Sequence, residues 1–127
     1  MRLKNFSLNL GAQIYKAFSE PSRIRILHLI FRNQEMCISD LELILNFTQT
    51  KTSRHLTYLK NSGILSSRKQ DQWVFYSINE EVLDIIDRLL SYLTKDPLLI
   101  KDAETFDILY SNRELALNRL KSMDWKA

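Results

Sequence analysis

Residues 48–70 read TQTKTSRHLTYLKNSGILSSRKQ, and this stretch decides the fold that we predict for the chain. It holds five basic side chains and no acidic one, whereas the whole chain of 127 residues has 18 basic and 15 acidic side chains and a net charge of +3. The other residues therefore carry 13 basic against 15 acidic side chains. Ordinary solubility charge mixes both signs, so a cationic segment of this kind indicates a surface that binds phosphate groups.

The first half of the stretch has the pattern of a helix that buries only a narrow stripe. Thr52, Leu56 and Leu59 fall in one sector at about 100° per residue, and the rest of the circumference is polar or basic. Gly63 is suited to end this helix because glycine adopts the left-handed conformation without strain. We therefore expect the helix to present a wide polar and basic face to its surroundings.

The second half has the composition of a β-hairpin. Residues 64–69 and 73–78 are runs of strand type, and residues 70–72 form the predicted turn, in which Asp71 tolerates a positive φ. The two basic residues at 68 and 69 then lie near the tip. A polar helix followed by a hairpin provides one element for the major groove of DNA and one for the neighbouring groove.

The residues before the stretch predict another helix and a tight turn. A short helix is expected to open at Cys37 or Ser39. Asn46 tolerates the left-handed conformation that ends a helix abruptly, and Thr48 is a suitable N-cap for the helix that follows. Residues 40–61 therefore predict a helix, a tight turn and a second helix.

Apolar spacing predicts further helices on both sides of this region, over residues 8–18, 21–33, 79–95 and 103–121. The apolar residues of the third of these helices cover more than one side, which favours burial against a second subunit. The predicted fold is mainly α with a small β-hairpin, a dimeric winged helix-turn-helix with the order α-α-α-α-β-β-α-α. It is one domain, 1–127, with the helix-turn-helix at about 40–61, the hairpin at 64–78, and further helices at about 8–18 and 79–121.

Bulk composition fits one soluble domain. A chain of 15.0 kDa with 45% hydrophobic residues is large enough to bury a core. No window approaches the roughly 18 apolar residues that a membrane span needs, and residues 1–5 are not followed by the apolar run of a signal peptide. The single cysteine, Cys37, fits a reducing cytoplasm. We therefore expect a cytoplasmic protein with no membrane partner.

Five motifs occur in one order along the chain. They are SEPSRIRIL at 19–27, EMCISDL at 35–41, TQTKTSRHL at 48–56, LKNSGIL at 59–65 and WVFY at 73–76. As a set, over roughly residues 10–93, they resemble the ArsR/SmtB family of bacterial winged-helix repressors. The resemblance implies that residues 64–78 form the wing and that the helices at about 8–18 and 79–121 are dimerisation helices, with the first and fifth helices joining most of a homodimer. It also implies that the homodimer binds an inverted-repeat operator in double-stranded DNA and is released by an effector.

The departures from the family concern its metal sites. Members that sense soft metals or arsenic carry Cys-x-Cys-Asp in the third helix, whereas this chain has Cys37 and Asp40 but Ser39 between them. Members that sense zinc use Asp and His side chains of the fifth helix, and residues 79–95 contain no histidine. Zinc and arsenic need three or four thiolate or imidazole ligands. We therefore expect no metal site and no cofactor.

The candidate DNA contacts all lie within the cationic stretch, and they are Gln49, Thr50, Lys51, Ser53, Arg54, His55, Lys60, Arg68 and Lys69. We expect Gln49, Thr50 and Arg54 to approach base edges, and the serine and the lysines of the helix to lie mostly on phosphates. The two hairpin cations favour a phosphate or minor-groove contact. His55 is expected on the flank of the helix, with a phosphate contact as the alternative.

Cys37 leaves two interpretations open. A lone cysteine at the start of a helix is most often a small buried hydrophobe. A helix N-terminus can also lower the pKa of a thiol, which would suit a redox-responsive repressor.

We interpret the chain as a sequence-specific DNA-binding transcriptional regulator, a homodimeric repressor of the ArsR type without the usual metal sites. The rival is a protein-interaction module that keeps the winged-helix fold and works through its apolar terminal helices. An enzyme is not expected, because the sequence has no nucleophile–base pair and no glycine-rich phosphate loop. No small-molecule effector is identified by the sequence.

Overall fold

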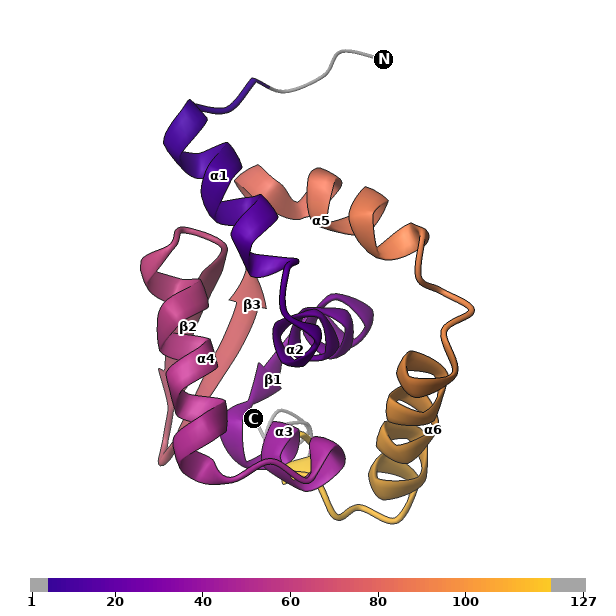
Figure 1. Ribbon diagram of the computed structural model, residues 1–127. Helices are drawn as coiled ribbons and strands as arrows, with labels where there is room; N and C mark the ends of the chain where they lie inside the picture. The colour runs from indigo at the N-terminus through magenta and orange to yellow at the C-terminus, as the bar shows by residue number, and fades with distance from the viewer. Residues whose placement is uncertain (1–4, 120–127) are drawn as a thin grey trace.

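The computed structural model describes residues 5–119 and is mainly helical with a small sheet (Figure 1). Its elements are α1 (Leu8–Ala17), α2 (Pro21–Asn33), β1 (Met36–Cys37), α3 (Ile38–Leu45), α4 (Gln49–Asn61), β2 (Leu65–Gln70), β3 (Trp73–Ile78), the 3-10 turn η1 (Glu80–Val82), α5 (Leu83–Ser91) and α6 (Pro97–Ser111). Within the described residues, no helix is long and apolar enough to cross a bilayer.

Helix α2 runs through the middle of the molecule, with the other elements arranged around it (Figure 1). It begins with Pro21 at its first position, where the missing N–H group costs nothing. Ile26, Leu27, Leu29 and Ile30 are completely buried. The observed bounds of this helix agree with the predicted range 21–33.

The sheet has three antiparallel strands in the order β1-β3-β2. The predicted hairpin is present, with Leu65 opposite Ile78 and Gln70 opposite Trp73. Its turn contains two residues rather than the three predicted, and Asp71 has the expected positive φ of 56°.

Strand β1 was not predicted. It contains only Met36 and Cys37, which pair with Tyr76 and Phe75 of β3. Both residues are buried, at 0% and 1% exposure. A two-residue strand is too short to show an alternating pattern, so nothing local distinguishes it from the start of a helix.

The tight turn between α3 and α4 is confirmed. Asn46 ends α3 in the left-handed conformation, with φ 58° and ψ 42°, and the Thr48 side chain accepts a hydrogen bond from the Lys51 N–H at 3.1 Å. At the other end of α4, Gly63 has φ 83°. Its N–H and that of Ile64 donate to the last carbonyl groups of the helix, which is the Schellman arrangement.

The last third of the chain differs from the prediction. Helix α6 begins at Pro97 rather than near Ala103, because the Asp96 carboxylate accepts hydrogen bonds from the Leu98 and Leu99 N–H groups. It ends at Ser111, shortly before Arg113 with φ 58°, and a short helical turn follows at 116–119. The predicted helical end at 120–121 lies outside the described residues.

Helix α6 packs on α2 and α3 of its own chain, and Figure 1 shows it on the side opposite α4. Leu99 and Phe106 face inward, at 4% and 6% exposure. Leu98, Ile100 and Ile108 of the same helix are exposed. The grouping of this segment with the dimerisation helices stays a prediction.

Candidate nucleic-acid interface

The outer face of α4 is the side that points away from the core. It consists of the exposed residues Gln49, Thr50, Ser53, Arg54, Thr57 and Lys60. No acidic residue lies in the helix, and its first turn adds the partial positive charge of unpaired backbone N–H groups. The arrangement is a convex, hydrogen-bonding and cationic surface, and the structure places five of the predicted contact residues on it.

Lys51 lies at the edge of this face and is half-buried. Its ammonium group is 4.0 Å from the centroid of the Phe47 ring, a cation–π contact within the first turn of the helix. The flexible lysine stem lets the charge remain near the surface while the stem covers apolar atoms.

The inner face of α4 consists of Thr52, His55, Leu56 and Leu59, all of which are buried. The Thr52 hydroxyl donates to the Thr48 carbonyl at 2.8 Å, so its polar atom is satisfied within the helix. The two leucines are fully buried. The stripe predicted from Thr52, Leu56 and Leu59 is therefore confirmed, with one additional member.

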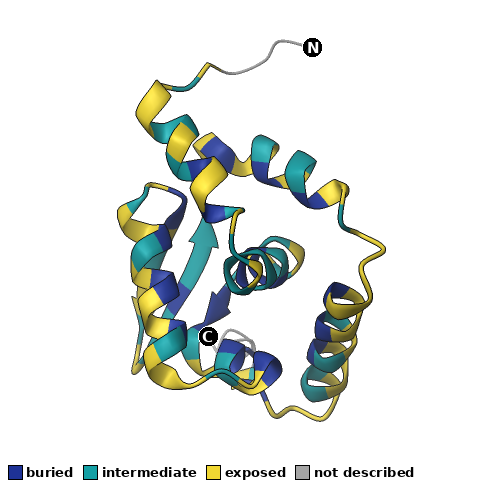
Figure 2. Ribbon diagram, in the orientation of Figure 1, coloured by how far each residue is buried: buried dark blue, intermediate teal, exposed yellow. Residues whose placement is uncertain are grey.

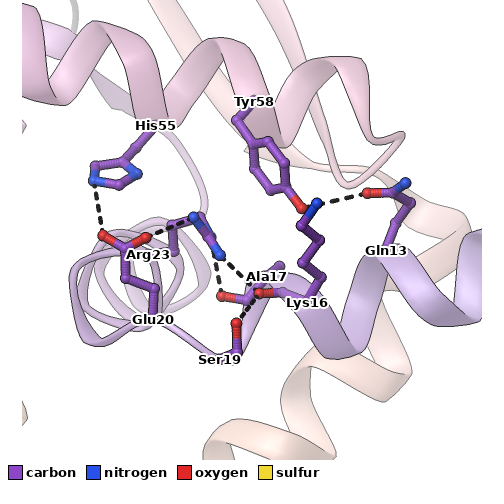
Figure 3. Close-up of polar contacts among 8 residues, drawn as sticks. All are labelled: Gln13, Lys16, Ala17, Ser19, Glu20, Arg23, His55 and Tyr58. Atoms are coloured by element: carbon purple, nitrogen blue, oxygen red, sulfur yellow. Dashed lines mark hydrogen bonds and ion pairs between the residues drawn. The ribbon is translucent and has the colours of Figure 1, made fainter.

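That additional member is His55, and the structure corrects its predicted place on the helix flank. The side chain is 5% exposed, and its Nε2 lies 3.3 Å from a Glu20 carboxylate oxygen (Figure 3). Burial is the main reason why the pKa of His55 is lowered; nearby cations add to the effect and Glu20 opposes it. His55 therefore cannot reach a phosphate in this conformation. Its spacing of three residues from Thr52 and four from Leu59 is the signal that could have placed it on the buried stripe.

A polar network joins the inner side of α4 to the end of α1 (Figure 3). The Tyr58 and Ser62 hydroxyl groups each donate to the Gln13 side-chain oxygen at 3.3 Å. The Arg23 guanidinium carbon lies 4.6 Å from the Tyr58 ring centroid. Tyr58 therefore packs within the chain and ties α4 to α1.

Arg23 fixes the end of α1 in the same network. Its guanidinium donates to the carbonyl groups of Lys16 at 2.7 Å and Ala17 at 3.2 Å, and to the Glu20 carboxylate at 2.8 Å (Figure 3). A cation at a helix C-terminus satisfies carbonyl groups that have no partner within the helix. The angle between α1 and α4 is therefore held by several directional bonds as well as by packing.

The two cations predicted on the wing differ in their contacts within the chain. Lys69 is exposed. Arg68 instead forms a two-pronged ion pair with Glu35, at 2.6 and 2.7 Å, and its guanidinium carbon lies 5.2 Å from the Phe75 ring centroid. The prediction treated Arg68 as a cation near the hairpin tip. It instead crosses to the loop before β1, and its charge is balanced there.

Cys37 is buried, at 1% exposure, and its sulfur lies 3.2 Å from the Ser39 hydroxyl oxygen. Burial is the largest cause that raises the pKa of the thiol to about 11, and the nearby Asp40 carboxylate also raises it. The thiol is therefore protonated at neutral pH, which favours the structural interpretation over the redox one.

Asp40 is also buried, at 3% exposure. Its two oxygens accept hydrogen bonds from the backbone N–H groups of Ala116 at 2.7 Å and Leu117 at 3.1 Å. Burial is the main cause that raises its pKa. Between residues 5 and 119, no group of three or more His, Cys, Asp or Glu side chains is arranged to hold a metal ion.

Comparisons with known proteins agree with this geometry. The family profile "Bacterial regulatory protein, arsR family" matches residues 20–67. The arsenic resistance transcriptional regulator ArsR1 of Pseudomonas putida is 38% identical over 77 residues, which cover 61% of this chain and 60% of that protein. The transcriptional repressor SdpR of Bacillus subtilis is 32% identical over 83 residues, which cover 65% of this chain and 91% of that protein. The structure of HlyU from Vibrio cholerae superposes with a TM-score of 0.60 at 28% identity, covering 65% of this chain and 90% of HlyU.

Proposed function

This chain belongs to the ArsR family of bacterial regulatory proteins, and from that membership we propose that it is a homodimeric repressor that binds an inverted-repeat DNA operator. As a member of this family it is a winged-helix, DNA-binding transcriptional regulator rather than an enzyme. The proposal adds the oligomeric state, the contact residues and the mode of repression.

The observation that carries the proposal is the outer face of α4. It is exposed and cationic, and it lies on a helix that the α3–α4 turn and the Gln13–Tyr58 contact hold in place. We propose that Gln49, Thr50 and Arg54 approach base edges in the major groove. Side chains of this kind can pair with adenine or guanine edges there.

The remaining contacts are proposed for the sugar-phosphate backbone. Lys51, Ser53 and Lys60 lie around the outer face of α4, and Lys69 lies on the wing. Arg68 would join them only after exchanging Glu35 for a phosphate. Several phosphate contacts in each subunit make binding steeply dependent on salt, because each contact releases condensed counterions.

Exposed apolar residues support dimerisation through α1 and α5. Leu8 and Tyr15 on α1 are 91% and 71% exposed, and Tyr92, just after α5, is 86% exposed. Figure 2 shows exposed residues along α1. Gly11 has open space around it, and it lines an apolar groove of about 370 Å³ with Leu8 and Tyr15. In the dimer, the two α4 helices would enter successive major grooves about 34 Å apart.

We propose that repression results from occupation of a promoter in the cytoplasm. Metal is not part of the proposal, because Asp40 already uses both oxygens within the chain and the Cys37 thiol is protonated. Release from DNA would require an effector that binds the DNA-free conformation of the dimer more tightly than the DNA-binding conformation.

The test is a titration of fluorescent duplex DNA from the region upstream of the coding sequence, at several salt concentrations, with random duplex as the comparison. We expect tighter binding to the upstream duplex and a log affinity that falls linearly with log salt. A pure dimer that binds neither duplex at low salt would contradict the proposal and favour a protein-interaction module.

A further inference from the structure

Residues 97–119, which we call the C-terminal arm, lie beyond the segment that the family profile matches. The arm packs on α2 and α3, away from α4 (Figure 1). Three polar ties hold it: the pairs Arg25–Asp102 and Arg32–Asp107, and the hydrogen bonds from the backbone at 116 and 117 to Asp40. These contacts therefore fix both the position and the orientation of the arm on the core.

The Arg25–Asp102 tie joins two side chains through a buried carboxylate. Asp102 is 2% exposed, and its two oxygens accept from the Nε and a terminal nitrogen of Arg25 at 2.9 and 3.0 Å. A two-pronged guanidinium–carboxylate pair fixes orientation as well as distance. The guanidinium plane of Arg25 is therefore set by a residue of the arm.

The same guanidinium also contacts the turn before α4. Its central carbon lies 5.2 Å from the ring centroid of Phe47. Phe47 stands between Asn46, which ends α3 in the left-handed conformation, and Thr48, which caps α4. Because the turn contains only these residues, the placement of the Phe47 ring constrains the direction in which α4 leaves α3.

Phe47 also touches α4 itself. The Lys51 ammonium is 4.0 Å from its ring, and the Lys51 N–H donates to the Thr48 hydroxyl at 3.1 Å. A continuous set of contacts therefore runs from Asp102 through Arg25 and Phe47 to the first turn of α4. It joins residues that are 51 positions apart in the sequence, at 51 and 102.

We propose that Asp102 is a positioning residue for DNA binding, which acts through Arg25 and Phe47 to hold the first turn of α4 in its binding orientation. The consequence for DNA rests on the proposed function, whereas the relay itself does not. Asp102 touches no residue of the outer face of α4, so its effect on affinity is indirect. Undocking the arm frees the guanidinium, loosens the turn and lowers operator affinity.

The experiment compares Asp102→Asn with Asp107→Asn in the full-length protein. Asp107 is the control for loss of a carboxylate from the same helix: both of its oxygens accept from one terminal nitrogen of Arg32, and its side chain is exposed, whereas that of Asp102 is buried. The Arg32 guanidinium carbon lies 5.7 Å from the ring centroid of Phe106, within the arm, and not over Phe47. Affinity for the upstream duplex is measured at low temperature, where circular dichroism verifies that both variants are folded.

We expect Asp102→Asn to weaken DNA binding by about two- to thirtyfold, the usual range for residues that modulate coupling, and Asp107→Asn to leave it unchanged. Amide hydrogen exchange at Lys51 should accelerate only in Asp102→Asn. Equal effects of the two variants on affinity and exchange would show that the arm contributes general stability alone, and would overturn the proposal.

Two further variants make the test independent of how well Asp102→Asn folds. Arg25→Lys keeps a charge for Asp102 but loses the planar group over Phe47, so it should also accelerate exchange at Lys51. In a Phe47→Leu background, Asp102→Asn should have no additional effect on that exchange. Unchanged exchange in Arg25→Lys, or a full additional effect in Phe47→Leu, would refute the relay. A wild-type protein that binds no DNA would refute the proposed function and leave the exchange result interpretable.

Discussion

The two faces of α4 differ in burial, and we expect the inner face to serve stability and the outer face to bind DNA. The inner face is buried, and its polar atoms either hydrogen-bond within the chain or lie beside a charged partner, as His55 does beside Glu20. On the outer face, within the part of the chain that the structure describes, Gln49, Thr50, Ser53 and Arg54 are exposed and form no hydrogen bond or ion pair with another side chain. A helix built in this way can change its binding residues without changing its fold.

The wing departs from this division. Its cation Arg68 faces outward, as Arg54 does, yet it is committed to Glu35. The free energy needed to bring each cation to a phosphate therefore differs. Arg54 gives up hydration and side-chain freedom, whereas Arg68 must also break its ion pair with Glu35. Surface position alone therefore does not identify a DNA contact. The predictions that follow test this contrast.

The largest effect is expected from the inner face. Leu56→Ala removes a completely buried side chain and should lower the free energy of unfolding by about 2–5 kcal/mol. Thr57→Ala, one position away on the outer face, should change it by less than about 0.5 kcal/mol. Urea unfolding of the two variants measures the difference, and equal destabilisation would erase the distinction between the faces.

On the outer face, Arg54→Ala should weaken binding to the operator by about 1–3 kcal/mol and leave the urea midpoint unchanged. Lys101→Ala, which removes the same charge from the exposed side of α6, serves as the control and should leave affinity nearly unaltered. Titrations at several salt concentrations make the measurement. An unchanged affinity and salt slope in Arg54→Ala would remove this residue from the site.

A smaller effect is expected from the wing. Glu35→Gln breaks the ion pair with Arg68, so DNA binding should strengthen at low salt. The slope of log affinity against log salt should steepen by about 0.9 for each phosphate that is newly contacted. Glu81→Gln makes the same charge change on η1, away from Arg68, and should leave the slope as it is. A slope in Glu35→Gln that equals the wild-type slope would show that Arg68 does not reach DNA.

The smallest effect concerns pH. Burial lowers the pKa of both His55 and His28 in the folded state, so the unfolded chain binds more protons just below the ordinary pKa of about 6.5. Stability should therefore be unaffected by these groups above that pH, and should fall as the pH drops below it. His55→Gln should remove part of the acid sensitivity in urea unfolding at pH 7.5 and 5.5. If the variant lost as much stability between pH 7.5 and 5.5 as the wild type, His55 would not be a cause of the acid sensitivity.

The sequence predicted the helix-turn-helix because its signals are local. Asn46, Thr48 and Gly63 each act on backbone groups within a few residues, and the α4 stripe depends only on helical spacing. The hairpin was predicted for the same reason. Its turn differs by one residue because composition does not distinguish the ends of adjacent strands.

Most of the missed features depend on contacts between distant parts of the chain, although the start of α6 is set locally by the Asp96 cap. Glu35 and Arg68 are 33 residues apart, and Asp40 accepts hydrogen bonds from residues 76 and 77 positions later. The local sequence around Glu35 or Asp40 does not indicate which distant segment the carboxylate will contact. His55 is a second exception, because its place in the buried stripe was available from spacing alone.

The short strand β1 has a mechanical consequence. Met36 and Cys37 pair with the wing strand β3, and the next residue, Ile38, begins α3. The β1–β3 pairing thus connects the hairpin to the helix-turn-helix, and a rotation of the hairpin away from α3 would break its backbone hydrogen bonds. We therefore expect bending needed for a close fit to fall on the DNA rather than on the protein, which would favour operators with flexible pyrimidine–purine steps near the wing.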